Sequence, residues 1–260
     1  MPWAGGYSPE VSNTAIRRHT RGASVSRTGE ARDCGLRRPM TQPGGTMSGT
    51  SSTTPADVFV HPLGLCDSEN VGAGTRVWAF AHVLRGAVIG RDCNICDGAY
   101  VEGGAIVGDR VTVKNQVLIF EGVTVEHDVF LGPGVVFTND LRPRAHIKRS
   151  GGALLPTTVQ RGATLGAGAV VVCGTTIGAD SFVGAGAVIT GDVPAHAFVV
   201  GNPARQIGWA CTCGERLGAD LHCSTCGRGF ARDRGTTSVS GLVDIDQAGQ
   251  SAAPTDRPDA

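Results

Sequence analysis

Residues 105–137 read AIVGDRVTVKNQVLIFEGVTVEHDVFLGPGVVF, and every sixth position of this stretch carries an aliphatic or aromatic side chain. These positions are Val107, Val113, Ile119, Val125, Leu131 and Phe137. The same spacing extends back to Phe59 and Leu65, and after a break it resumes from Val159 to Ile189. None of the 20 positions in this register is polar. The residue two positions earlier is also restricted to small or aliphatic types in most repeats, which indicates that both positions point inward.

A repeat of six residues predicts a short strand followed by a turn, because inward and outward side chains alternate along a strand. Three repeats make one coil of 18 residues, and such coils stack so that each buries its apolar face on the next. Twenty repeats predict an all-β fold, a parallel β-helix of six to seven coils stacked about 4.8 Å apart. Gly72, Gly90 and Gly108 follow the aliphatic position at intervals of 18 residues, and we expect them at corners that need positive φ.

The composition argues against other classes of protein. Of the 260 residues, 41% are hydrophobic but only 5% are aromatic, and the formal net charge is zero. Domains that bind nucleic acid are usually basic, and no apolar run reaches the ~18 residues of a membrane helix. Residues 1–30 contain no apolar segment typical of a secretory signal, so we expect a cytoplasmic protein that binds neither nucleic acid nor membrane.

Composition also divides the chain. Residues 1–56 are rich in Ser, Thr, Gly, Pro and Arg and are predicted to be a disordered N-terminal extension. Met40 and Met47 lie within it, so translation starting at either of them is an open alternative. The coil domain is predicted over 57–209, a small cysteine-rich segment over 210–231, and a disordered tail over 232–260, in which LVDI is the single apolar run.

Several segments outside the hexads point to a narrower family. The sequence has WAFAH at 78–82, KNQV at 114–117, FEGV at 120–123, FTND at 137–140 and GNPAR at 201–205. Over residues 57–209 it resembles the hexapeptide-repeat acyltransferases, and in these segments the branch that N-acetylates amino sugars on UDP or dTDP. The resemblance implies a left-handed coil, acetyl-CoA as co-substrate and a nucleotide sugar as acceptor.

The resemblance also implies where the acceptor binds. Residues 138–158 interrupt the hexads and are predicted to form a loop that leaves the coil from one corner. Glu121 is expected one coil away from Asn139 at that corner, and the loop would bring Asp140 and Arg144, whose guanidinium suits a diphosphate. Such breaks in a solenoid usually lie on the binding side.

Two residues are candidates for the chemistry. Asn115 is expected on the same side of the prism as His82 and near the corner where the loop begins. The resemblance implies that Asn115 orients the amine or the reacting carbonyl while the departing CoA sulfur takes the proton. His82 is the alternative base, or else a residue of a subunit contact. Asn115 at a corner could also serve only the turn.

The last coils are expected to carry CoA. Gly166, Ala167, Gly184 and Ala185 would let the pantetheine arm lie close to backbone amides, and Arg205 is a candidate phosphate partner. Tight corners are a sufficient structural reason for these glycines, so the assignment rests on the resemblance.

The chain has nine cysteines, and four of them lie close together. Cys211-Thr-Cys213-Gly and Cys223-Ser-Thr-Cys226-Gly form two short motifs, whose spacing predicts a zinc-ribbon-like segment with four thiolates around a structural zinc. His222 could replace one ligand, and a flexible tail with free thiols is the other interpretation.

Other functions fit the same coil less well. A γ-class carbonic anhydrase needs three histidines, two of them five residues apart, and the histidines here lack that spacing. An O-acetyltransferase with a histidine base is a closer alternative, and a non-catalytic scaffold is a third. Trp78, Phe80 and Tyr100 on a flat outer face predict a homotrimer with its active site between subunits.

Overall fold

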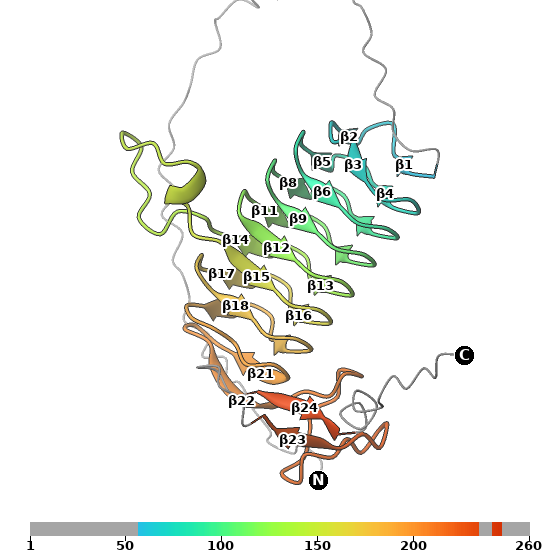
Figure 1. The fold of residues 1–260 in the computed structure, drawn as a ribbon, viewed down its shortest axis with the longest axis vertical. Coiled ribbons are helices and arrows are strands. Elements are labelled where there is room, and N and C mark those ends of the chain that lie inside the picture. The colour runs from blue at the N-terminus through green and yellow to red at the C-terminus, as the bar shows by residue number, and fades with distance from the viewer. Residues whose placement is uncertain (1–56, 234–240, 246–260) are drawn as a thin grey trace, which may run out of the picture. The chain divides into compact units, whose positions relative to one another are not determined.

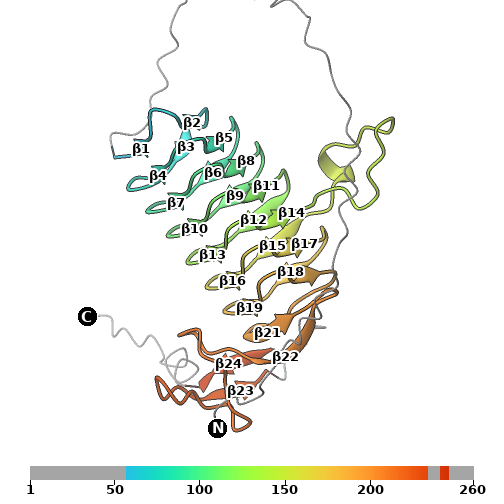
Figure 2. The same ribbon diagram turned by 180° about the vertical axis from the view of Figure 1, so that it is seen from behind.

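The computed structural model describes residues 57–233 and 241–245, and within them the chain coils around three parallel sheets (Figures 1 and 2). We call the sheets side A, side B and side C. Side A contains β1 (Phe59–Val60), β4 (Arg76–Val77), β7 (Asn94–Ile95), β10 (Thr112–Val113), β13 (Phe130–Leu131), β16 (Thr164–Leu165), β19 (Phe182–Val183), β21 (Ala197–Val200) and an antiparallel final strand, β22 (Arg205–Trp209). Side B contains β2 (Leu65–Cys66), β5 (His82–Val83), β8 (Tyr100–Val101), β11 (Leu118–Ile119), β14 (Val136–Phe137), β17 (Val170–Val171) and β20 (Val188–Ile189). Side C contains β3 (Asn70–Val71), β6 (Val88–Ile89), β9 (Ile106–Val107), β12 (Val123–Val125), β15 (Thr157–Val159) and β18 (Thr176–Ile177).

The stack confirms the predicted β-helix. The strands β1 to β18 make six coils of three strands each, and β19, β20 and β21 continue the stack. The register pairs residues 18 positions apart, such as Val83 with Val101. The 18 hexad positions from Val71 to Ile189 are all buried, none more than 5% exposed, and form one continuous core. No helix among the described residues is long and apolar enough to span a membrane.

The first coil departs from the predicted register. Val60 pairs with Val77, and Cys66 pairs with Val83, so the inward residues are Val60 and Cys66. Phe59 and Leu65 were predicted inside but lie outside, 45% and 57% exposed. The corner before β3 is one residue shorter than the others, so β1 and β2 are shifted by one residue relative to the later strands. A shift of one residue turns each side chain of a strand to the opposite face.

The glycines after the aliphatic position have a different role from the predicted one. Positive φ occurs two residues further along, as at Gly74 (77°), Asp92 (56°) and Arg110 (55°). At Gly90, a Cβ would lie 2.5 Å from the carbonyl carbon of Gly108 in the next coil. Glycine is needed there because adjacent coils approach each other closely, not because of a left-handed backbone.

One loop interrupts the coils, and one small subdomain follows them. The loop between β14 and β15 leaves the stack at the corner between sides B and C and contains the 3-10 helix η1 (Gly151–Ala153) (Figure 1). After β22, the cysteine-rich segment continues into β23 (Phe230–Arg232), which pairs with β24 (Leu242–Asp244). The predicted tail boundary at residue 232 is therefore wrong, since the LVDI run forms a strand of this subdomain. The predicted disorder of residues 1–56 and of the remaining tail lies outside the described residues.

The cysteine-rich segment packs on the last coil. The Nδ1 atom of His196 lies 3.1 Å from the carbonyl oxygen of Ala210, and its ring centroid lies 4.9 Å from that of Phe230. The amide of Leu242 donates to the carbonyl of Ala195. Burial lowers the pKa of His196 and raises that of Asp180 beside it. The segment thus covers the end of the stack, where a solenoid would otherwise expose its core.

Candidate active site

Asn115 lies at the corner between sides A and B. Its column, read from the strand register on side A, contains Asp97 before it and Ala167 and Ala185 after it. The Nδ2 atom of Asn115 donates to Oδ2 of Asp97 at 3.3 Å. The left-handed residue of this corner is the neighbouring Gln116, with φ 59°, so the turn does not require asparagine at 115.

The predicted CoA residues occupy the same corner. A Cβ on Gly166 would lie 2.5 Å from the amide nitrogen of Ala185, and one on Gly184 would lie 2.7 Å from Cγ1 of Val200. These glycines are therefore required by coil packing itself. Ala167 and Ala185 are exposed and leave the corner free of bulky side chains. Arg205 is exposed at the start of β22, with its Nη1 atom bonded to the carbonyl of Ala204.

The predicted acceptor residues lie at the corner between sides B and C. Glu121 and Asn139 follow the paired strands β11 and β14 at equivalent positions, as predicted. Asp140 is held by its own loop, because the amide of Arg142 donates to Oδ1 at 2.8 Å and Arg149 donates to Oδ2 at 3.0 Å. These hydrogen bonds lower the pKa of Asp140. Arg144 is exposed, and its Nη1 atom donates to the carbonyl oxygen of Pro143.

Side B carries His82 between these two corners. His82 and Tyr100 occupy one column, where their rings meet edge to face with centroids 6.2 Å apart, and the ring of Phe120 lies 6.1 Å from that of Tyr100. The Nε2 atom of His82 lies 3.0 Å from Oδ2 of Asp67. A carboxylate on Nε2 fixes the imidazole and leaves Nδ1 as the atom that can accept a proton.

The structure corrects one part of the predicted grouping. Asn115 borders side B, like His82, but at the opposite corner from the loop, since β11 separates Asn115 from Glu121. The six-residue step from Asn115 to Glu121 across side B places these two corners roughly 15–20 Å apart. A single chain therefore does not bring Asn115 together with Glu121, Asn139, Asp140 and Arg144.

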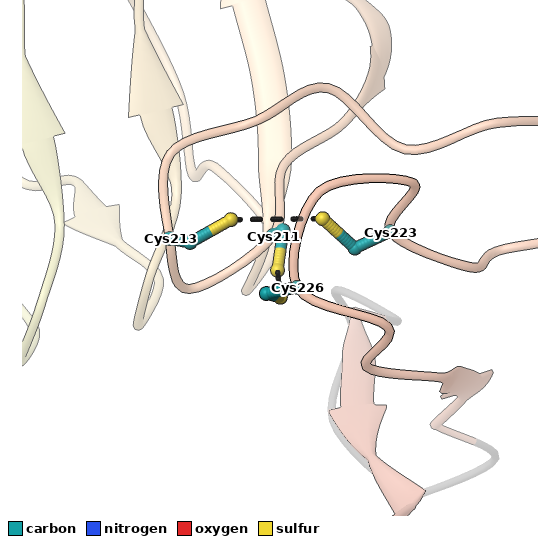
Figure 3. A group of neighbouring side chains, drawn as sticks. All are labelled: Cys211, Cys213, Cys223 and Cys226. Carbon is teal, nitrogen blue, oxygen red and sulfur yellow. Dashed lines mark hydrogen bonds between the residues drawn. The ribbon is translucent and has the colours of Figure 1, made fainter.

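The four cysteines of the C-terminal segment converge as predicted. The Sγ atoms of Cys211, Cys213, Cys223 and Cys226 lie within 4.8 Å of one another, and Figure 3 shows them pointing together from two loops. The separations are 3.4 Å for Cys211 and Cys226 and 3.6 Å for Cys213 and Cys223. His222 is not part of this group; its Nδ1 atom lies 2.9 Å from the carbonyl of Asp220.

The two cysteine motifs fold as similar turns. The amide of Gly214 donates to the carbonyl of Cys211, and that of Gly227 donates to the carbonyl of Cys223. Each glycine has positive φ, 90° and 77°. Burial raises the pKa of Cys211 to about 12, while a hydrogen bond from the backbone amide of Cys226 lowers that of Cys223 to about 6. The stabilised thiolate at Cys223 suits a metal ligand.

Three residues near these sites were missed from the sequence. Asp67 is the first residue of the first coil's short corner, directly after β2, so its place beside His82 depends on the shifted register. Arg149 donates to Asp140 within the same loop, and the loop has no sequence repeat from which this contact could be predicted. Asp97 was available to sequence reasoning, because it precedes Asn115 by one full coil of 18 residues.

Comparison with known proteins agrees with the predicted coil. Residues 156–191 match the model of the family described as bacterial transferase hexapeptide, six repeats. Over 171 residues, the chain is 45% identical to a dTDP-3-amino-3,6-dideoxy-alpha-D-galactopyranose 3-N-acetyltransferase of Aneurinibacillus thermoaerophilus. That alignment covers 66% of this chain and 86% of the relative.

Similar solved structures include two acetyltransferases. A mutant of the GDP-perosamine N-acetyltransferase of Caulobacter crescentus, in complex with CoA and GDP-perosamine, is 23% identical with a TM-score of 0.38, covering 60% of this chain and 55% of that one. A hexapeptide-repeat acetyltransferase of Vibrio cholerae, complexed with acetyl-CoA, is 25% identical with a TM-score of 0.40, covering 48% and 70%. This chain thus spans little more than half the length of the first structure. With its register of hexads and its 45% identical relative, the chain belongs to the hexapeptide-repeat acyltransferases, in the group of the nucleotide-linked amino-sugar N-acetyltransferases.

Proposed function

We propose that this protein transfers the acetyl group of acetyl-CoA to the amine of an amino sugar carried on a nucleoside diphosphate, as a step in the synthesis of a surface polysaccharide or glycan. The observation that carries the proposal is the 45% identity to the dTDP-3-amino-sugar enzyme over 86% of its length. A dTDP-linked 3-amino-6-deoxyhexose is therefore the first acceptor to test.

The chemistry needs a neutral amine near a polarised thioester. The amine nitrogen attacks the thioester carbonyl carbon, the C–S bond breaks as the tetrahedral intermediate collapses, and the amine loses one proton. Asn115 would orient the reacting groups, and the departing CoA thiolate would take the proton. The CoA arm would lie along Gly166–Ala167 and Gly184–Ala185, with a phosphate near Arg205.

The acceptor would lie against the corner between sides B and C. Glu121, Asn139 and Asp140 would bind the sugar, and Arg144 would bind the diphosphate through its guanidinium. Because Asp140 is held by Arg149 and by the amide of Arg142, the loop is organised before any ligand binds.

A panel of nucleotide sugars tests this proposal. Purified protein with acetyl-CoA is assayed against UDP- and dTDP-linked amino sugars, and we expect the highest kcat/KM for a dTDP-linked 3-amino sugar. Release of CoA at the background rate with the whole panel would contradict the proposal and favour a non-catalytic scaffold.

A hydroxyl acceptor is the second candidate. The observation that favours it is the contact between His82 and Asp67, because a histidine oriented by a carboxylate is suited to deprotonate a hydroxyl. An amine that reacts in its neutral form needs no such base.

His82→Ala distinguishes the two. Since the thiolate can take the proton from the amine, we expect kcat to fall by less than about tenfold. The control is His127→Ala. His127 lies at the corner between sides C and A, where its Nδ1 atom accepts a hydrogen bond from the backbone amide of Asp109. A loss of about 1000-fold for His82→Ala alone would instead assign His82 as the general base.

The separation of the two corners supports a homotrimer with sites between subunits. One chain places the acceptor residues and Asn115 too far apart for one small molecule, whereas two chains packed side by side can join opposite corners. Phe80, 71% exposed at the same corner as Asn115 but two coils before it, adds apolar surface that a monomer rarely leaves uncovered.

Sedimentation velocity tests the assembly. We expect a single species with three times the 26.7 kDa mass of the chain at micromolar concentration. A species with the mass of one chain under the same conditions would contradict a site shared between subunits.

The four cysteines support a structural zinc site. Zinc bound by four thiolates at about 2.3 Å places neighbouring sulfur atoms roughly 3.8 Å apart, and the observed separations of 3.4 Å and 3.6 Å fit that geometry. The ion would stabilise the segment that covers the last coil, without a part in the reaction. A reducing compartment such as the cytoplasm would keep the thiolates available.

A further inference from the structure

Asp97 lies directly beside the asparagine that the proposed reaction uses. The two residues occupy equivalent positions of consecutive coils at the corner between sides A and B. Nδ2 of Asn115 lies 3.3 Å from Oδ2 of Asp97. Asp97 is exposed and Asn115 is half-buried, so both are open to a ligand at this corner.

The contact fixes which end of the amide faces away from Asp97. An ionised carboxylate only accepts hydrogen bonds, whereas a carboxamide has one accepting and one donating end. The donating end must therefore face Asp97. No described residue donates to Oδ1 of Asn115, and the next residue of the column, Pro133, has no backbone N–H.

The orientation of this amide decides what it does to an amine. An amide oxygen accepts an N–H of the amine and leaves the nitrogen lone pair free to attack the thioester. A reversed amide would donate its own N–H to that lone pair and block the attack. We propose that Asp97 is a positioning residue that holds Oδ1 of Asn115 toward the acceptor amine. The inference rests on the proposed function and assigns Asn115 to the amine rather than to the thioester carbonyl.

A series of substitutions at Asp97 tests this role, with dTDP-3-amino-3,6-dideoxygalactose and acetyl-CoA as substrates. Asp97→Asn can present either end to Asn115, and we expect kcat to fall about fivefold, the effect of losing one hydrogen bond. Asp97→Lys presents only donors and so reverses the amide; its loss should approach the ~100-fold expected for removing the amide. KM for acetyl-CoA should change little in both.

Asp109 provides a matched control. It occupies the same position in its hexad, and its carboxylate likewise bridges two coils by accepting the amide of Arg91, but it lies at the corner between sides C and A. Asp109→Asn and Asp109→Lys should keep kcat within about twofold of the parent value. In the Asn115→Ala background, substitution of Asp97 should have no further effect. A persistent effect there, or equal losses in the Asp97 and Asp109 series, would overturn the proposal.

A second measurement does not require turnover. In protein labelled with ¹⁵N-asparagine, the side-chain amide signals of Asn115 are assigned by their loss in Asn115→Ala. We expect these signals to shift in Asp97→Asn and to stay in place in Asp109→Asn. Unchanged signals in Asp97→Asn would overturn the positioning role, whereas inactivity on every nucleotide amino sugar with shifted signals would count against the proposed function alone.

Discussion

Asn115→Ala is expected to lower kcat by about 100-fold, comparable to the loss of one oriented hydrogen-bonding group in an active site. Asn115 is half-buried at a corner where Gln116 carries the left-handed backbone, so alanine at 115 disturbs neither the turn nor the core. Steady-state kinetics with a verified nucleotide amino sugar measures the effect, and thermal unfolding shows whether the coil is intact.

The control for this variant is Asn70→Ala. Asn70 is exposed on side C, away from both corners that border side B, and its loss should leave kcat unchanged. Near-parent activity of Asn115→Ala would show that the acceptor site lies elsewhere in the assembly.

Removal of zinc is expected to unfold the C-terminal segment. We predict one zinc per chain by elemental analysis of protein purified without chelators, and none in Cys223→Ser. The small core of this segment has five buried side chains, with Trp209 and Leu221 packed against them: Cys211, Leu217, Cys223, Phe230 and Leu242. A core of this size cannot order the segment alone, and structural zinc contributes on the order of 10 kcal/mol to such folds.

Limited proteolysis measures whether the segment unfolds without zinc. Cleavage within residues 210–232 should become rapid in Cys223→Ser, while the coil resists digestion. Cys66→Ser, which changes a half-buried cysteine of the first coil, should retain the zinc and the resistance. Zinc-free wild-type protein with the same resistance to protease would contradict the metal site.

Much of the coil could be predicted because its information is periodic. An inward residue recurs at every sixth position. Val77 and Ile177 are therefore predicted to be inside by the same pattern, and both are fully buried. The pattern failed where the period changes by one residue, in the corner before β3, because corner length is set by the backbone and Phe59 and Leu65 are as apolar as their neighbours.

The site was predicted in part. The 18-residue period predicts which residues occupy equivalent positions in consecutive coils, and Glu121 and Asn139 share a corner as expected. The period does not reveal contacts within the loop, such as the one between Arg149 and Asp140. The expectation that Asn115 lies near the corner where the loop begins is wrong, because side B lies between them. The repeat alone does not say which corners of neighbouring subunits adjoin in an assembly.

The choice between amine and hydroxyl acceptors tests the proposed function most directly. The protein is incubated with acetyl-CoA and either dTDP-3-amino-3,6-dideoxygalactose or the matched dTDP-6-deoxygalactose, which carries a hydroxyl at the same carbon. Mass spectrometry and the release of CoA report the products. We predict the 3-acetamido product from the amine and no product from the hydroxyl analogue. Acetylation of the hydroxyl analogue at a comparable rate would contradict an amino-sugar N-acetyltransferase.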